Sequence, residues 1–247
     1  MKLLALDTAS ELCSAALWLD GQLLARESVA PRAHAALILP MIDALLAEAG
    51  LALAGFDAIA FGRGPGAFTG VRLAAAIAQG LGFAAGLPLI PISDLRATAA
   101  QALLQVNAHG VLVCQDARME EVYWGCFERR ASSRLSSQPT AGAPPAVGSV
   151  GAEGVAPAAA IELPGLWHSG VTVVGAGSGF AAYPELSRRL QERLALTLPQ
   201  LQPRAREIAW LAAEEGMAAA IAAEEALPVY LRDRVTATPN APESNSS

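Results

Sequence analysis

The feature that most constrains the fold is the Asp20–Gly21 pair, which lies between two apolar runs near the start of the chain. Asp-Gly is a dipeptide that two-residue β-hairpin turns favour, because both of its residues adopt positive φ readily. The first of the two runs follows a short apolar stretch, "KLLALD", that ends at Asp7. The sequence therefore predicts that the chain opens with three antiparallel strands.

Helices and strands alternate after this opening. Apolar residues recur at helical spacing over residues 33–49, and Gly50 follows as a C-cap. "FDAIAF" predicts a buried strand, residues 70–85 a helix, "PLIPI" a strand and residues 94–105 another helix. Three antiparallel strands followed by such an alternation predict an α/β fold, with mixed sheets covered by helices.

The rest of the chain predicts a second unit. "GVLVCQDARMEEVYWGCFE" predicts two strands joined by a charged turn, and "VTVVGAGSGF" a further strand that runs into a turn. Near the end, "REIAWLAAEEGMAAAIAAEEA" predicts an amphipathic helix and "PVYLRD" a last extended segment.

These patterns divide the chain into two subdomains. We expect residues 1–106 to form the first and residues 107–203 the second, with residues 204–235 packing back on the first. Residues 131–160 are rich in Ala, Ser, Pro and Gly, which predicts a flexible loop. Residues 236–247 offer almost nothing to bury, which predicts a disordered tail.

Composition limits where the protein works and what it binds. The net charge of −6 argues against direct clamping of nucleic acid, because phosphate contacts need clustered Lys and Arg. Cys13, Cys114 and Cys126 are odd in number and have no zinc spacing, so they indicate buried thiols in a reducing, cytoplasmic compartment. Residues 73–92 are long enough to cross a membrane, but Pro88 interrupts them and favours a buried helix–strand unit instead.

The glycine-rich stretch "FGRGPGAFTGVRLAAAIAQGLG" raises the question of a phosphate site, because such turns often hold anions at a helix N-terminus. A P-loop needs Lys followed by Ser or Thr after the last glycine, and this chain has Val71 and Arg72 after Gly70. The acid of a dinucleotide site is missing, and Pro65 removes one N–H donor. The sequence therefore favours a tight strand-to-helix turn over direct nucleotide binding.

The stretch "ALDTASELCSAAL" carries a second candidate. An acid at the end of a first strand, here Asp7 followed by Thr8, is the phosphate-loop layout of actin-like ATPases, in which a carboxylate can hold hydrated Mg²⁺. An Asx-type turn closed by Asp7 explains the same residues. No pair of histidines has metal-binding spacing among His34, His109 and His168, and G-x-S-x-G is absent. We therefore expect no metal and no catalytic residue.

Five stretches together closely resemble the TsaB (YeaZ) family: "LALDTASELCSAAL", "PRAHAALILPMIDALLAEAG", "AFGRGPGAFTGVRLAAAIAQGLGFAAGLPLIPISDL", "DARMEEVYW" and "PVYLRDRV". The resemblance covers nearly all of residues 1–127 and parts of residues 171–235. It implies an actin-like (ribonuclease H-like, ASKHA) fold in two subdomains. It also implies a role in the bacterial machinery that makes N6-threonylcarbamoyladenosine in tRNA, with the catalytic paralogue TsaD and the ATPase TsaE as partners.

Differences from the sequence of the paralogue TsaD determine whether the resemblance implies catalytic activity. TsaD carries a metal-binding H-x-x-x-H where this chain has Asp94 and Thr98, and Thr98 is a poor ligand. The resemblance therefore implies a non-catalytic scaffold and activator without a cofactor, which contacts tRNA only through its partners. The alternative is an independent metal- or ATP-dependent transferase or hydrolase of the actin-like superfamily. Glu120 stands where the family usually has Gly, so we expect that turn to be adjusted.

The resemblance also places the interface. In the family, the two helices at residues 33–49 and 70–85 pair with TsaD or, without it, with a second copy, and part of each helix must also belong to the core. The expected interface residues are Leu37, Met41, Leu45, Val71, Ala74, Ala75, Ala78 and Gly82. The residues that could lie near a nucleotide bound by a partner are Asp7, Thr8, Gly64 and Gly66.

Overall fold

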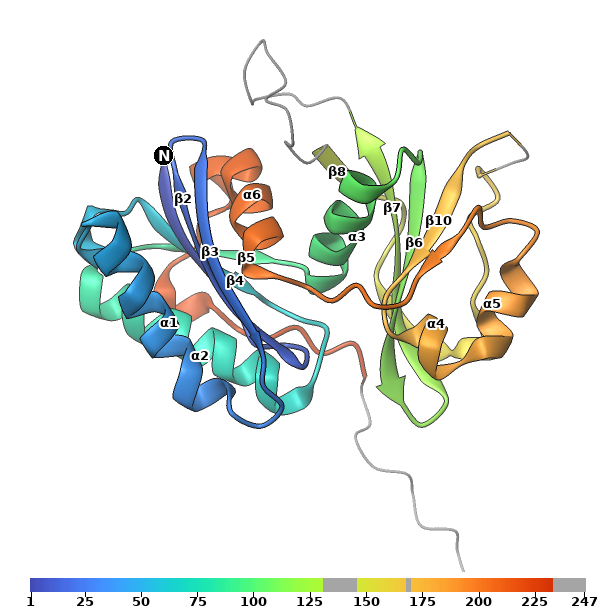
Figure 1. Cartoon of the computed structure of the whole chain (residues 1–247), viewed down its shortest axis with the longest axis horizontal. Coiled ribbons are helices and arrows are strands. Elements are labelled where there is room, and N and C mark those ends of the chain that lie inside the picture. Colours follow the sequence, from blue (N-terminus) through green and yellow to red (C-terminus); the bar gives the residue numbers. More distant parts are fainter. Residues whose placement is uncertain (131–145, 168–169, 233–247) are drawn as a thin grey trace, which may run out of the picture.

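The computed structural model describes residues 1–130, 146–167 and 170–232. Two β-sheets lie on either side of a layer formed by two helices, α3 (Asp94–Gln105) and α6 (Ala205–Glu215). Further helices cover the outer face of each sheet, as Figure 1 shows. The predicted α/β architecture, with mixed sheets covered by helices, is confirmed.

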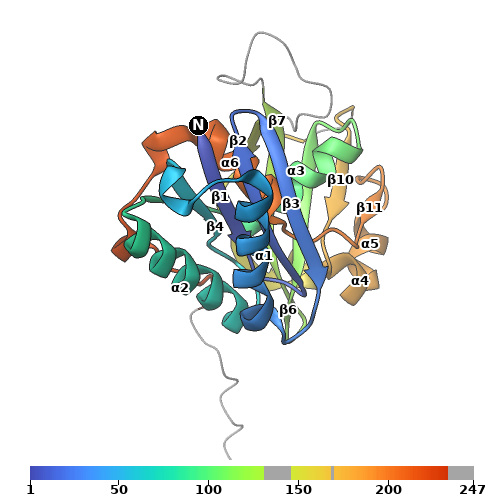
Figure 2. The ribbon, with the colours of Figure 1, turned by 60° about the vertical axis from the view of Figure 1, so that its left-hand side comes forward.

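The first sheet has the strand order β3-β2-β1-β4-β5. Its strands are β1 (Lys2–Asp7), β2 (Leu12–Leu19), β3 (Gln22–Val29), β4 (Ala58–Gly62) and β5 (Leu89–Ile92). The first three are antiparallel, whereas β1, β4 and β5 run parallel. Asp20 and Gly21 both have positive φ between β2 and β3, which confirms the predicted hairpin turn. Helices α1 (His34–Ala49) and α2 (Phe68–Ala85) cover its outer face (Figure 2).

The second sheet has the order β11-β10-β6-β7-β8, and β9 also pairs with β7. Its strands are β6 (Gly110–Arg118), β7 (Glu121–Arg130), β8 (Ala146–Ser149), β9 (Gly154–Pro157), β10 (Val173–Ala176) and β11 (Thr197–Leu198). Two short helices, α4 (Gly179–Ala182) and α5 (Pro184–Leu190), cover its outer face.

Residues 146–157 differ from the predicted flexible loop, because they form β8 and β9 on β7. The many Ala and Gly residues of this stretch gave no strand pattern in the sequence. In the structure Val147 is buried against α3 and the second sheet. The remaining part of that prediction, residues 131–145, lies outside the described residues, as does the predicted disordered tail at 236–247.

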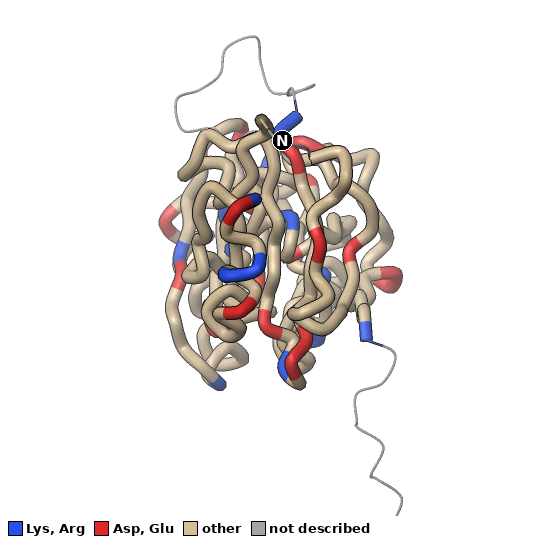
Figure 3. Tube along the Cα trace, turned by 90° about the vertical axis from the view of Figure 1, so that its right-hand side faces the viewer, with Lys and Arg blue, Asp and Glu red and all other residues tan. Residues whose placement is uncertain are grey.

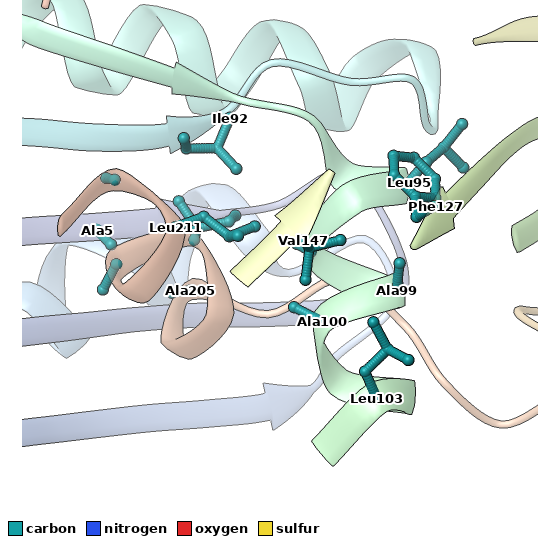
Figure 4. Packing of buried hydrophobic residues seen from close by; sticks show 14 of the residues in the cluster. Ala5, Ile92, Leu95, Ala99, Ala100, Leu103, Phe127, Val147, Ala205 and Leu211 are labelled. Atoms are coloured by element: carbon teal, nitrogen blue, oxygen red, sulfur yellow. The ribbon is translucent and has the colours of Figure 1, made fainter. Parts of the chain in front are cut away.

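One hydrophobic cluster joins the two sheets through α3 and α6. Figure 4 shows Ala5 and Ile92 of the first sheet, Leu95 of α3, and Phe127 and Val147 of the second sheet in this cluster. Helix α6 follows the last strand of the second sheet in the sequence and packs on β1 and β2 of the first sheet.

Helix α6 is shorter than predicted. It ends at Glu215, and Gly216 follows with φ of 67°. Two 3₁₀ turns, Gly216–Ala219 and Ala223–Glu225, replace the rest of the predicted helix. Residues 226–232 contain no helix or strand.

Helix α2 is the one described helix that is long and apolar enough, by length and composition, to cross a membrane. It packs on the first sheet, and its small residues lie in the same core cluster as Ile59 and Phe61 of β4. This supports the predicted buried helix–strand unit. The three cysteine thiols are free and buried, which confirms the prediction of buried thiols.

Candidate functional site

Two acidic side chains meet where β1, β4 and α3 come together. Asp7 is the last residue of β1, Asp94 is the first residue of α3, and both are completely buried. Gly62 ends β4 between them, and a Cβ there would overlap an oxygen of each carboxyl group. Strands β1, β4 and β5 pair in parallel, and Asp94 follows β5, so the end of β1 and the start of α3 lie at the same edge of the sheet.

Backbone N–H groups hold one oxygen of each carboxyl group. The Ala9 N–H donates to Asp7 Oδ1 at 3.0 Å, and the Gly64 N–H donates to Asp94 Oδ2. The first of these bonds confirms the Asx-type turn that the sequence offered for Asp7. The other oxygen of each group, Asp7 Oδ2 and Asp94 Oδ1, is buried and has no hydrogen-bond partner among the described residues. Two neighbouring carboxyl groups can share a hydrogen bond only when one of them carries a proton, because a carboxylate has no proton to donate.

The environment of the pair favours the protonated form of both carboxyl groups. Burial raises the pKa of Asp7 from 3.8 to about 6, although the hydrogen bond from the Ala9 N–H opposes the rise. Burial also raises the pKa of Asp94 well above its usual value, and the charges of Asp7 and Glu153 raise it further. Both shifts therefore favour the neutral carboxyl form, and for Asp94 the neighbouring negative charges add to the effect of burial.

Polar contacts connect this pair to the second sheet. Ser93 caps α3 by accepting from the Arg96 N–H at 3.2 Å, and its hydroxyl donates to Glu153 Oε1. Arg63 lies 3.6 Å from Glu153 Oε2. Among the described residues, no group of three or more His, Cys, Asp and Glu side chains is placed to hold a metal ion.

The glycine turn packs against the residues that follow β1. A Cβ on Gly66 would lie 2.6 Å from the Ala9 carbonyl oxygen, and one on Gly70 would overlap the Thr8 carbonyl oxygen. The Thr8 hydroxyl donates to the Gly70 carbonyl at 2.7 Å, and the Ala67 N–H donates to the Ala9 carbonyl at 2.7 Å. These contacts confirm the predicted tight turn, since the glycines allow two backbones to touch.

The structure thus brings together all the residues that could lie near a partner-bound nucleotide. Thr8, which follows Asp7, donates to Gly70 of the glycine turn, and Gly66 of the same turn packs against Ala9. Gly64 donates to Asp94, which the sequence had singled out only as half of a lost metal site. The pairing of Asp94 with Asp7 could not be read from the sequence, because the two lie on different elements.

The β6–β7 turn contains Glu120, the residue at which the sequence predicts an adjusted turn. Arg118, Met119 and Glu120 have φ values of 64°, 58° and 62°, which is the left-handed region that favours glycine. Glu120 therefore adopts a positive φ despite its side chain, and the expected adjustment of the turn stays a prediction. The Glu120 carbonyl accepts from the Ala158 N–H at 2.9 Å, which helps to hold the conformation.

The predicted interface residues lie mostly inside the protein. Six of the eight are buried in its own core: Leu45, Val71, Ala74, Ala75, Ala78 and Gly82. Leu37 and Met41 are partly exposed. The small residues of α2 face inward because the helix must approach the first sheet and the 3₁₀ turn at Ala223–Glu225 closely. Helical periodicity identified the small-residue face of α2, but it did not show whether that face points to the core or to solvent.

The outward side of α2 carries other residues. Ala76, Gly80 and Phe83 are exposed there, and a Cβ on Gly80 would meet nothing within 4 Å. Leu39 of α1 is also exposed, at 45%. The two helices therefore present a surface of small and apolar residues to solvent.

Comparison with known proteins gives matches over nearly the whole chain. The family described as "TsaD: tRNA N6-adenosine threonylcarbamoyltransferase" matches residues 27–239. The Escherichia coli (strain K12) "tRNA threonylcarbamoyladenosine biosynthesis protein TsaB" is 38% identical over 239 residues, which cover 95% of this chain and 96% of that protein. The Haemophilus influenzae protein of the same name is 54% identical over 124 residues, 50% of this chain and 52% of that protein.

Solved structures agree with these sequence matches. "YeaZ from Pseudomonas aeruginosa" is 40% identical with a TM-score of 0.78, covering 93% of this chain and 99% of that one. A second Pseudomonas aeruginosa protein, described as uncharacterized with similarity to peptidase YEAZ, is 42% identical with a TM-score of 0.81, covering 94% and 99%. The two-sheet architecture described above is thus the actin-like fold, and the chain belongs to the TsaB (YeaZ) family.

Proposed function

We propose that this protein takes part in the biosynthesis of threonylcarbamoyladenosine in tRNA as a non-catalytic subunit. In this proposal it pairs with the catalytic paralogue TsaD, helps to recruit the ATPase TsaE, and forms a homodimer when TsaD is absent. The names of its close relatives support the pathway. The match to the TsaD family supports a common fold for the two partners of the pair.

The observation that carries the non-catalytic role is the closed state of the Asp7–Asp94 pair. A general base or a Mg²⁺ ligand must reach substrate or water, whereas both carboxyl groups are completely buried and each accepts from a backbone N–H group. The Ala67 N–H at the start of α2 is already bonded to Ala9, so it is not free for a phosphate.

The outward faces of α1 and α2 are the surface that we propose for pairing. Ala76 and Gly80 are small, so a partner helix can approach α2 closely there. Phe83 of α2 is 63% exposed and Leu39 of α1 is 45% exposed, so each helix also offers apolar area to a partner. Leu37 and Met41, from the interface predicted by sequence, border this surface as partly exposed residues.

Charge supports an indirect contact with tRNA. The net charge is −6, and acidic and basic positions are interspersed along the trace in Figure 3. Phosphate binding gains from clustered cations, so we assign the direct tRNA contact to a partner. The three buried thiols are consistent with work in the cytoplasm.

Co-purification with TsaD from the same organism tests the proposal. Ala76→Arg places a charge on the exposed face of α2 and should abolish co-elution while circular dichroism stays unchanged. Ala181→Arg makes the same change on exposed α4 in the second subdomain and should leave co-elution intact. If the protein is instead an independent metal- or ATP-dependent enzyme, the isolated chain should hydrolyse ATP, and Asp7→Asn should abolish that activity.

A further inference from the structure

Residues 227–232, here called the C-terminal strap, cross from the first subdomain to the second. Ala226 is 1% exposed, whereas Leu227 is 68% exposed, so the chain leaves the core between these two residues. Figure 1 shows the strap passing from the side of α2 towards β6 and β7. None of its six residues is buried.

The first anchor of the strap lies on the glycine turn. The Val229 N–H donates to the Arg63 carbonyl at 2.7 Å, and a Cβ on Gly64 would lie 3.1 Å from the Val229 carbonyl oxygen. The strap therefore covers the backbone of the turn directly.

An aromatic contact reinforces this anchor. The ring of Tyr230 lies 6.2 Å from that of Phe68, the first residue of α2. The Arg72 guanidinium lies 3.2 Å from the Phe68 ring centre and 4.9 Å from the Tyr230 ring centre. A cation next to two rings is attracted to both, which ties the strap to the first turn of α2.

The second anchor lies on the β6–β7 turn. Arg232 donates to the carbonyls of Ala117 at 3.1 Å and Arg118 at 3.5 Å, and it forms an ion pair with Glu121. This turn contains the three consecutive left-handed residues that end at Glu120. Such a backbone persists only where its surroundings hold it, and the Arg232 guanidinium supplies part of that support.

We propose that the C-terminal strap is a latch that closes on both anchors together and opens as one unit while the core stays folded. Local opening is expected of a segment with few buried apolar contacts, and the buried Ala223 and Ala226 keep its base in place. Opening uncovers the backbone of the glycine turn at Arg63 and Gly64, and it releases the support of the β6–β7 turn. The latch thus couples access to the glycine turn with the shape of a turn in the other subdomain.

Two variants, each at one anchor, test this coupling in the full chain. Glu121→Ala removes the ion pair of Arg232, and Tyr230→Ala removes the aromatic contact. Trypsin cleavage after Arg232 reports opening at the second anchor, and hydrogen exchange of the Val229 amide reports opening at the first. Each variant should raise both rates, by roughly tenfold, because losing a charge-assisted hydrogen bond or a cation–π contact shifts the opening equilibrium by about that factor.

Glu128→Ala is the matched control, because it removes an exposed ion pair with Arg130 on the same strand, β7. It should change neither rate. Glu121→Gln should give an intermediate effect if Glu121→Ala folds poorly. Anchors that respond independently, each variant raising only the rate at its own anchor, would overturn the latch. Unchanged rates would do the same, as would exchange that rises equally in the core amides, since the opening would then be global unfolding.

Discussion

The carboxyl groups of Asp7 and Asp94 lie on either side of Gly62 inside the protein, at the meeting point of β1, β4 and α3. Both groups have raised pKa values because they are buried. A raised carboxyl pKa means that the folded state binds more protons than the unfolded state, so stability is highest below the unfolded pKa and falls as pH rises through the folded pKa. For Asp7 that window runs from 3.8 to about 6, and the raised pKa of Asp94 adds to the loss of stability as pH rises.

Asp94→Asn should therefore flatten the pH dependence of stability. Asn cannot ionise, it can still accept from the Gly64 N–H, and its amide can donate to the Asp7 carboxylate. We expect urea unfolding at pH 5 and pH 8 to show a smaller loss of stability in the variant, by about 1–3 kcal/mol. Exposed Asp43→Asn is the control, and parallel pH profiles for all three proteins would contradict the raised pKa of Asp94.

Glu120→Gly should stabilise the protein by about 1 kcal/mol, because glycine adopts positive φ without the steric cost that a side chain carries. The hydrogen bond from the Ala158 N–H uses the backbone carbonyl and is kept. Glu120→Ala separates the causes: it removes the carboxylate but keeps Cβ, so it should give no gain. The midpoint of thermal unfolding measures both. Equal gains from the two variants would show that the charge matters and the backbone does not.

Ala75→Arg and Ala78→Arg should unfold the protein or destabilise it by about 3–5 kcal/mol, because each puts a charge into the core under α2. Ala76→Arg, one position away and exposed, should cost less than about 0.5 kcal/mol. Circular dichroism with urea unfolding distinguishes them. A folded Ala78→Arg variant of normal stability would mean that this face of α2 is open to solvent.

Glu207 forms an ion pair with Arg204 at the start of α6, and its side chain is 1% exposed. Glu207→Leu leaves the Arg204 guanidinium without that partner and should cost about 3–5 kcal/mol. The double variant Arg204→Met/Glu207→Leu should recover most of this loss, because it removes both charges together. A double variant as unstable as the single one would show that the cost arises from packing around α6 and not from the unpaired charge.

Local signals in the sequence predicted the elements whose ends are fixed by their own residues. Asp20–Gly21 set the first hairpin, Gly50 ends α1 in the left-handed conformation, and Ser93 caps α3 through its side chain. Helix α6 was predicted too long, because the apolar pattern continues past Gly216, the residue directly after the end of the helix.

Contacts between distant elements could not be predicted in the same way. The pairing of Asp7 with Asp94 depends on the order of strands in the sheet, and β8 depends on the free edge of β7. The small face of α2 was recognised by its period, but only the position of the first sheet decides that Ala78 points inward. Val147 could not be recognised as a strand residue either, because it lies in a stretch of Ala, Gly and Pro.

The most direct test of the scaffold role is the threonylcarbamoyladenosine content of tRNA, measured by mass spectrometry in a depleted strain that carries each variant at equal protein level. Asp7→Asn keeps an oxygen that can accept from the Ala9 N–H and so keeps the turn, and we expect it to restore the modification fully. Ala76→Arg should fail to restore it, because pairing through α2 is lost, while TsaD remains present. A stable Asp7→Asn protein that abolishes the modification, together with an Ala76→Arg protein that restores it, would contradict the account and favour an enzyme acting through Asp7.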